Sequence, residues 1–312
     1  MRALAKTMLT EFARRLPPGA RRALLEGLAE QGEQYEAFQA LGRSLGVADI
    51  AVSGRFGLIE GSLDDNVLMA AYARRKTWSA AKNAFFIDLF EQRDGGTYID
   101  VGANIGLTTI PIARNPKVAC KAFEPEPSAF RHLARNVASN CPSANVELFN
   151  RALFDKRTML RFELSDRNLA DHRIRVRGEG GRFGEEQWRV IEVAAERLDD
   201  ILDPQRLVPP IAVKITAQGS EAHIVAGGRA VLAATEAVAF QLYPYALARA
   251  KGDAEFLGDF LRHGFTSGAV MIGDDDAPLA WRPVEAVAVE VEALAQRYRD
   301  APYSYYHVFA RK

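Results

Sequence analysis

From residue 97 onward, short apolar runs alternate with longer segments in which apolar residues recur at helical spacing. Runs of this length and near-continuous hydrophobicity are typical of strands buried on both faces of a parallel sheet. Five of them predict such strands: TYIDV (97–101), VACKAF (118–123), NVELFN (145–150), IAVKI (211–215) and AVAFQL (237–242). The longer segments predict helices over 104–114, 128–139, 220–233 and 254–263. This repeat predicts an α/β fold, a mostly parallel sheet between helices.

Two further regions modify this plan. TSGAVM (266–271) and YSYYHVFA (303–310) predict closing strands that pair antiparallel, which brings the sheet to seven strands. Between residues 156 and 194 the pattern is less regular. There MLRFEL and WRVIEV predict strands on either side of a loop rich in Gly and Arg, residues 175–184.

The first part of the chain follows a different pattern. Residues 1 to about 50 carry apolar side chains such as Leu24 and Leu28 at helical spacings, and residues 64–92 predict further helices. A short extended piece, AVSGRFGLIEGSL (51–63), separates them. We therefore expect a helical N-terminal extension over residues 1–80 and a main α/β domain over residues 81–312, with Trp78 packing one on the other.

Composition excludes several function classes. Hydrophobic residues make up 48% of the 312 residues, enough for a packed core, and Lys plus Arg equals Asp plus Glu at 40 each. Zero net charge gives no bulk attraction to nucleic acid. No apolar run approaches the roughly 18 residues that span a bilayer, so we expect no transmembrane segment. The Arg-rich N-terminus is expected to form a surface helix docked on the domain, a membrane-surface helix being the alternative.

The two cysteines, Cys120 and Cys141, show no metal-ligand spacing, and no His/Cys cluster does either. We therefore expect no metal site and two buried thiols acting as small apolar residues. Two thiols in a chain this long are typical of a reducing cytoplasm, which is the expected location. The sequence leaves open whether the chain forms a homo-oligomer.

The strongest chemical signal is Asp100-Val101-Gly102-Ala103-Asn104-Ile105-Gly106, which follows a predicted strand and leads into a helix. Gly102 and Gly106 remove side chains where a turn is tight and a ligand approaches the backbone. The helix start offers free N–H groups and a partial positive charge. Asp100, at the end of the strand, is placed to anchor a ligand's ammonium or a nearby network.

An acidic residue ends the next strand. Glu124 lies about 20 residues past the glycine turn, where ribose hydroxyls are bound in nucleotide-binding sheets. The glycines follow G-x-x-x-G and not G-x-G-x-x-G, so the pyrophosphate fingerprint of dinucleotide sites is absent. A nucleoside with an amino-acid tail fits this turn better than a dinucleotide does, which favours S-adenosylmethionine over NAD as cofactor.

These residues resemble a known family. YIDVGANIGLTT, AFEPEPSAFRHLARNVASN, NVELFNRALFD, RLDDIL and VKITAQGSEAHIVAGGRAVL look like the FkbM-type methyltransferases over about residues 80–245. The resemblance implies a class I, S-adenosylmethionine-dependent methyltransferase domain that usually methylates hydroxyl groups on sugars, glycans, polyketides or other small molecules. It implies that the cofactor is bound by Asp100, Gly102, Asn104 and Gly106 around its methionine part, by Glu124 at the ribose, and by the Ala152–Asp155 segment, including Ala152 and Asp155, beside the adenine.

The chain departs from the family where the fourth strand ends. The family usually has Lys-Ile-Asp-x-Glu-Gly there, whereas this chain has Thr216 and Gln218 in place of the two acids. Gln241, in FQLYP, stands where the family usually carries a Glu. Lys214, Gly219, Ser220 and Glu221 still match.

The departures bear on mechanism. An alcohol that receives a methyl group must lose a proton, and a carboxylate or histidine normally takes it. We therefore predict Lys214, Glu221 and His223 as catalytic residues, the last two as substitute bases. The stronger expectation is the ordinary one, in which Glu221 stabilises its helix N-terminus and His223 is a packed surface or core histidine. The alternative function is a methyltransferase-fold protein with reduced or no catalysis that binds cofactor or a protein partner; a nucleotide-sugar or NAD enzyme is a third.

Side chains for the acceptor are less specific. The arginines between residues 173 and 189 could contact an anionic acceptor, although a self-paired, solvated loop is the stronger expectation. Tyr243, Tyr245 and the three tyrosines of residues 303–306 could line an acceptor pocket, those of 303–306 being more readily explained as packing of the closing strand.

Overall fold

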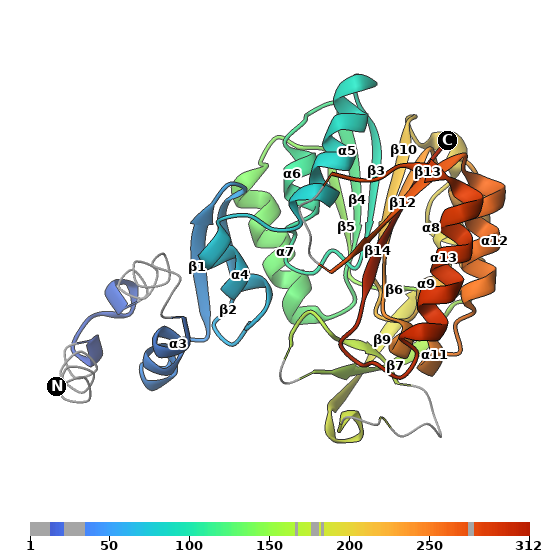
Figure 1. Ribbon diagram of the computed structural model, residues 1–312. Helices are drawn as coiled ribbons and strands as arrows, with labels where there is room; N and C mark the ends of the chain where they lie inside the picture. Colours follow the sequence, from blue (N-terminus) through green and yellow to red (C-terminus); the bar gives the residue numbers. More distant parts are fainter. Residues whose placement is uncertain (1–12, 22–34, 166–167, 176–180, 182–183, 274–277) are drawn as a thin grey trace.

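The computed structural model describes residues 13–21, 35–165, 168–175, 181, 184–273 and 278–312. Its main sheet has eight strands in the order β13-β12-β14-β11-β10-β3-β4-β5 (Figure 1). The strands are β3 (Gly96–Val101), β4 (Val118–Phe123), β5 (Val146–Phe149), β10 (Ile211–Ile215), β11 (Ala237–Leu242), β12 (Ser267–Ile272), β13 (Arg282–Pro283) and β14 (Tyr306–Arg311).

The direction of the strands confirms the predicted fold class. β11, β10, β3, β4 and β5 run parallel to one another. β14 lies antiparallel between β11 and β12, so the closing strands form the expected antiparallel pair. The seven predicted strands are all present, and the two-residue β13 adds an eighth at the edge beside β12. The fold is therefore a mostly parallel α/β sheet.

Helices cover both faces of this sheet, because alternate side chains of each strand point to opposite sides. Tyr98 packs against Phe86 on one side with ring centroids 5.0 Å apart, while its neighbour Ile99 belongs to the core on the other side. Cys120 and Cys141 are buried free thiols, as predicted. The first face is covered by α5 (Ala80–Gln92), α6 (Thr109–Ala113) and α7 (Pro127–Asn140), and the second by α8 (Leu198–Ile201), α9 (Glu221–Gly227), α10 (Arg229–Ala233), α12 (Ala254–Gly264) and α13 (Val284–Arg297).

Three helices differ from the prediction. The helix expected to begin at residue 104 begins at Thr109, because Asn104 and Gly106 have positive φ angles of 48° and 97° and cannot belong to it. The helix expected over 220–233 is divided at Gly228, whose φ of −124° interrupts the helical geometry. The helix α13 was not predicted, although its buried positions fall at helical spacing: Val284, Val287, Ala288, Val291 and Leu294.

A second, smaller sheet lies below the main sheet in Figure 1, with the order β6-β9-β7-β8. It contains the two strands predicted between residues 156 and 194. Its strands are β6 (Ala152–Leu153), β7 (Thr158–Leu164), β8 (Arg173–Ile174) and β9 (Arg189–Glu196). The short 3-10 helix η1 (Glu185–Gln187) precedes β9, η2 (Pro204–Arg206) precedes β10, and the helix α11 (Pro244–Arg249) follows β11.

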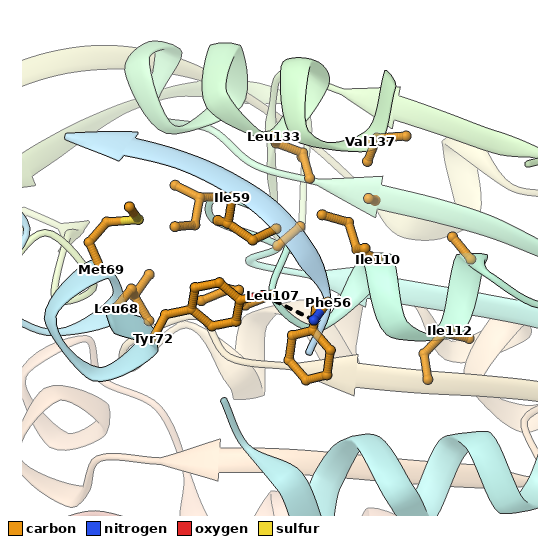
Figure 2. Packing of buried hydrophobic residues seen from close by; sticks show 14 of the residues in the cluster. Phe56, Ile59, Leu68, Met69, Tyr72, Leu107, Ile110, Ile112, Leu133 and Val137 are labelled. Carbon is orange, nitrogen blue, oxygen red and sulfur yellow. Dashed lines mark hydrogen bonds between the residues drawn. The ribbon is translucent and has the colours of Figure 1, made fainter. Parts of the chain in front are cut away.

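The N-terminal region contains a β-hairpin as well as helices. The hairpin is β1 (Asp49–Gly54) and β2 (Gly57–Ser62), between α3 (Tyr35–Ser44) and α4 (Leu68–Arg75). It sits against α7, where Asn136 accepts from the N–H of Glu60 at 2.7 Å and donates to its carbonyl at 2.8 Å. Figure 2 shows Phe56 and Ile59 in the same apolar cluster as Leu133 and Val137. The hairpin thus shares a core with the main sheet. Leu24 and Leu28 lie outside the described residues.

None of the helices described is both long and apolar enough to cross a lipid bilayer.

Candidate functional site

A cavity lies at the carboxyl ends of the parallel strands and is closed from the other side by the second sheet. The main sheet reverses its order between β3 and β10, and ligands of open α/β sheets bind at such a switch point. The cavity wall combines residues after β3 and β4 with residues after β10 and β11. The residues that line the cavity include Lys82, Gly102, Asn104, Glu124, Ala152, Leu153, His172, Lys214, Thr216, Gln218, Ile224, Gln241, Tyr243 and Tyr305.

The turn after β3 requires glycine because a side chain at either position would collide with neighbouring parts of the protein. Gly102 has a φ of +75°, and a Cβ there would lie 2.0 Å from the carbonyl oxygen of Thr216. At Gly106, with a φ of +97°, a Cβ would meet the side chains of Leu133 and Ile110 at 3.0 and 3.2 Å. Gly102 and Asn104 line the cavity, whereas Gly106 lies outside the lining. The turn therefore brings the end of β3 directly against the end of β10.

Asp100 and Lys214 form a buried ion pair beneath this turn. The Nζ of Lys214 lies 2.9 Å from Oδ1 of Asp100, and it donates to the carbonyl of Gly102 at 2.6 Å. The other oxygen of Asp100 accepts from the hydroxyls of Thr108 and Thr109, each at 2.7 Å. Asp100 is fully buried and outside the cavity lining, whereas Lys214 is in the lining. Both residues therefore hold the turn in place. Asp100 does so through its contacts with Lys214, Thr108 and Thr109.

Glu124 stands at the cavity edge directly after β4. Its two carboxylate oxygens accept from the backbone N–H groups of Asn104 and Glu126, each at 2.8 Å. Burial raises the pKa of this carboxyl to about 7, against the effect of those two hydrogen bonds. Each carboxylate oxygen has a second lone pair, so Glu124 can still accept a hydroxyl from the cavity. This is the position that the sequence predicted for ribose binding.

The apolar part of the wall includes Ala152 and Leu153 from β6 and Ile224 from α9. Asp155, at the end of the predicted adenine segment, is outside this lining. It pairs instead with His223, whose Nδ1 is 2.7 Å from Oδ2 of Asp155. The other ring nitrogen of His223 lies 3.0 Å from the carbonyl of Ala250, and the ring stacks on Phe154. Asp155 and His223 are thus brought together with each other and not with the cavity.

Glu221 also lies outside the cavity lining. It is completely buried, and its carboxylate accepts from the backbone N–H groups of Ala217 and Gly219, each at 2.9 Å. These bonds hold the loop between β10 and α9, in which Gln218 has a left-handed φ of 51°. Burial is the main cause that raises the pKa of Glu221 to about 7, while the backbone hydrogen bonds lower it.

A measurable pH dependence follows from Glu221. Because its pKa of about 7 in the folded protein exceeds 4.5, the ordinary value of a glutamate exposed to water, the folded state binds more protons than the unfolded state between these values. The contribution of Glu221 to stability is therefore highest below pH 4.5 and declines as pH rises through about 7, by on the order of 3 kcal/mol. We expect Glu221→Gln to remove this decline when urea unfolding is compared at pH 5 and pH 8. A variant with the same pH slope as the wild type would contradict the assignment.

The second sheet is fastened across the cavity at two points. The side chain of Asn104 donates to the carbonyl of Leu169 at 3.4 Å, and that of Gln218 donates to the carbonyl of Ala170 at 2.7 Å. Within the second sheet, the fully buried Glu163 of β7 forms ion pairs with Arg249 of α11 and with Arg175. These contacts keep the cavity covered.

The arginines between residues 173 and 189 were expected either to contact an anionic acceptor or to pair within the protein. Arg173 and Arg175 are in ion pairs with Asp171 and Glu163, and neither lines the cavity. They are self-paired, as expected, but Arg173 is buried and Arg175 is only partly exposed, so neither is fully solvated. Arg177 and Arg182 fall outside the described residues.

The far end of the cavity, at β11, contains a residue that the sequence analysis missed. Lys82, in the first turn of α5, is 3% exposed, and its Nζ donates to Oε1 of Gln241 at 3.4 Å. The amide nitrogen of Gln241 donates to the hydroxyl of Tyr243 at 2.9 Å, and the ring of Tyr243 packs on Tyr305 with centroids 5.0 Å apart. A single lysine at the start of an amphipathic helix carries no signal in the sequence that would reveal this position.

Two oxygens of the described cavity lining are buried without a hydrogen-bond partner among the described residues: Oγ1 of Thr216 and Oε1 of Gln218. Both residues line the cavity at the end of β10. A buried acceptor without a donor is costly, and a ligand that supplies N–H groups would satisfy it.

Comparison with known proteins gives likeness of structure only. No family model and no curated protein sequence matches the chain. Among solved structures, TYW2 of M. jannaschii in complex with AdoMet is 13% identical with a TM-score of 0.37, covering 85% of this chain and 87% of that one. The plantazolicin methyltransferase BpumL in complex with SAH is 8% identical with a TM-score of 0.36, covering 74% and 82%.

Precorrin-6y C5,15-methyltransferase of Geobacter metallireducens is 15% identical with a TM-score of 0.35, covering 74% and 87%. Streptococcus pneumoniae Sp1610 is 12% identical with a TM-score of 0.35 over 70% of this chain, and the match spans only 64% of Sp1610. The fold is therefore described by the order and direction of its own strands, which form a Rossmann-like, mostly parallel α/β sheet.

Proposed function

We propose that this chain is an S-adenosylmethionine-dependent methyltransferase that acts on an oxygen of a small-molecule or glycan acceptor. The observation that carries the proposal is the cavity at the switch point of the sheet, with Glu124 beside the turn of Gly102. The sequence resemblance supports the same activity and implies a hydroxyl as the usual acceptor.

The residues around the cavity suit each part of this cofactor. Glu124 would accept the ribose hydroxyls, and Ala152, Leu153 and Ile224 would pack on the adenine. The buried oxygens of Thr216 and Gln218 would accept N–H groups from the ammonium of the methionine part. The G-x-x-x-G turn leaves no pyrophosphate cradle, which counts against a dinucleotide.

The protein's contribution to transfer would be alignment and exclusion of water. The sulfonium of the cofactor supplies an already activated methyl group. The ion pair of Asp100 and Lys214 fixes the turn, and the contacts of Asn104 and Gln218 with the second sheet keep the cavity covered. Such positioning is worth a large part of the rate in a displacement reaction.

A second function is favoured by one observation. Glu221 and His223, the residues predicted as substitute bases, both lie outside the described cavity lining. A protein of this fold that binds the cofactor without transferring a methyl group would need neither residue.

Calorimetric titration of the purified protein with S-adenosylmethionine, S-adenosylhomocysteine and NAD tests the proposal. We expect micromolar binding of the first two and none of NAD, and turnover of labelled methyl groups separates an enzyme from a binding protein. The absence of S-adenosylhomocysteine binding by well-folded protein would refute both functions.

A further inference from the structure

We propose that Asp49, Glu60 and His132 form a binding site for Zn²⁺ that fastens the β1–β2 hairpin to α7. Each of the three residues offers one ligand atom, a carboxylate oxygen or an imidazole nitrogen, and these atoms all lie within 4.8 Å of one another. None of the three belongs to the described lining of the cavity. The site is therefore separate from the proposed cofactor site, and it does not depend on the proposed function.

The pairing of β1 with β2 brings the two carboxylates together. Asp49 lies opposite Ser62, and Glu60 is two residues before Ser62 on the same strand. Residues two apart on a strand point to the same face, so Asp49 and Glu60 are diagonal neighbours on one face of the hairpin. Two carboxylates at this separation repel each other, and a cation bound between them removes the repulsion.

The helix α7 brings the histidine to the same place. Figure 1 shows the hairpin beside this helix, and Asn136 of α7 donates to the carbonyl of Glu60 at 2.8 Å. His132 precedes Asn136 by four residues, so it lies on the same face of the helix, one turn nearer its start. There its Nε2 lies 3.1 Å from Oδ1 of Asp49. The hairpin and the helix thus each contribute ligands to one point.

A buried nitrogen without a hydrogen bond points to a ligand at this position. His132 is only 2% exposed, and its Nε2 is buried without a hydrogen-bond partner among the described residues. Oδ1 of Asp49 is close enough for a hydrogen bond, but the angle of the contact is not that of one. A buried polar nitrogen in this state is costly. A metal ion bound to Nε2 and to Asp49 would satisfy it, because the neutral imidazole is a good metal ligand.

The ion pair of Glu60 is compatible with a metal. Arg135 of α7 donates to Oε1 of Glu60 at 2.6 Å, and the arginine side chain is 53% exposed. Each carboxylate oxygen has two lone pairs, so Glu60 can bind a metal without giving up its contact with Arg135. Carboxylates that bind metals are usually hydrogen-bonded to a neighbouring group as well, and that group orients them. Arg135 is placed to orient Glu60 in this way.

The donor set favours zinc over the alkaline-earth cations. Zn²⁺ accepts imidazole nitrogen together with carboxylate oxygen, whereas Ca²⁺ and Mg²⁺ bind oxygen ligands. Tetrahedral zinc with bonds of about 2.0–2.2 Å separates its ligand atoms by about 3.3–3.6 Å, near the 3.1 Å between His132 and Asp49. Rotation of the longer Glu60 side chain brings in the third ligand, and water takes the fourth position. The ligands are spread over residues 49–132 without the spacing of a zinc motif, so the sequence gave no sign of them.

Titration of the chelator-treated full chain with ZnCl₂ at pH 7.5 tests this inference. We expect calorimetry to show one Zn²⁺ bound per chain, and the midpoint of urea unfolding to rise with Zn²⁺, because a ligand of the folded state stabilises it. Asp49→Asn and His132→Gln should each weaken binding about tenfold or more, since even the loss of a group that orients a metal ligand has an effect of this size. His263→Gln, which changes an exposed histidine of α12, is the matched control and should bind Zn²⁺ as the wild type does.

The results that would overturn the inference are distinct. Folded wild-type protein that shows no saturable Zn²⁺ binding, or Asp49→Asn that binds as tightly as the wild type, would overturn it. Asp49 is partly exposed, so this variant keeps the test decisive if His132→Gln does not fold. X-ray absorption at the zinc edge should show nitrogen and oxygen ligands only; sulfur at about 2.3 Å would place the ion on a cysteine and overturn the site. Equally tight binding of Ca²⁺ or Mg²⁺ would contradict the choice of zinc.

Discussion

Asp100→Asn is expected to lower the free energy of unfolding by about 3–5 kcal/mol, the cost of leaving a buried charge without its partner. The substitution keeps the shape of the side chain but leaves the ammonium of Lys214, which is 3% exposed, without a counter-ion. Urea unfolding at pH 7 measures the effect. The same substitution should weaken cofactor binding, because the pair fixes the turn that carries Gly102.

A double variant separates the ion pair from the individual side chains. Asp100→Asn combined with Lys214→Met removes both charges and should recover a large part of the lost stability, because a neutral pair needs no compensation. Asp94→Asn is the matched control, because Asp94 pairs with Lys117 on the surface, where the two side chains are 82% and 59% exposed. Such a pair contributes little. If the double variant is as unstable as Asp100→Asn, the buried ion pair is not what holds the turn.

The second large effect is expected at Glu124. Glu124→Gln should weaken binding of S-adenosylhomocysteine about tenfold to a hundredfold, since a hydrogen bond to a charged group contributes about 1.5–3 kcal/mol. In the wild type, the backbone N–H groups of Asn104 and Glu126 each donate to one carboxylate oxygen of Glu124. The amide of the variant has only one acceptor oxygen, so its NH₂ group must face one of these two N–H groups. Calorimetric titration of both proteins at pH 8 measures the loss.

The pH dependence of binding distinguishes a ribose contact from a merely structural role for Glu124. Its pKa of about 7 means that below pH 7 the carboxyl must first lose a proton before it can accept both hydroxyls. Wild-type affinity should therefore rise from pH 6 to pH 8, and Glu124→Gln should show no such rise. Glu91→Gln, on the exposed side of α5, is the matched control and should behave as the wild type. An equal rise in Glu124→Gln would place the titrating group elsewhere.

Local sequence pattern was sufficient for most of the sheet. The predicted strands at 118–123, 211–215 and 237–242 have the observed bounds, because each is a short run made up mostly of apolar residues. The same reasoning placed Glu124 at the end of the second parallel strand. It did not give the start of α6, since the left-handed conformation of Asn104 depends on how the turn fits against β10.

The roles of individual side chains were decided by tertiary contacts. Asp100 has the sequence context of a ligand anchor, but the arrival of Lys214 from a strand more than 100 residues later makes it half of a buried pair. Glu221 and His223 closely follow the end of β10, where a catalytic base was expected. In the folded protein Glu221 accepts from the backbone of the preceding loop, and His223 pairs with Asp155. Proximity in sequence could not show which of these side chains reach the cavity.

The sequence by itself determined the α/β class and the strands of the main sheet whose carboxyl ends line the cavity, because apolar periodicity and glycine turns are local properties. Only the tertiary structure decided that Gly102 is required by the carbonyl of Thr216 and that Lys82 meets Gln241 across 159 positions of the chain. Pairings of that kind depend on which segments the folded core brings together, and neither partner alone carries a signal of it.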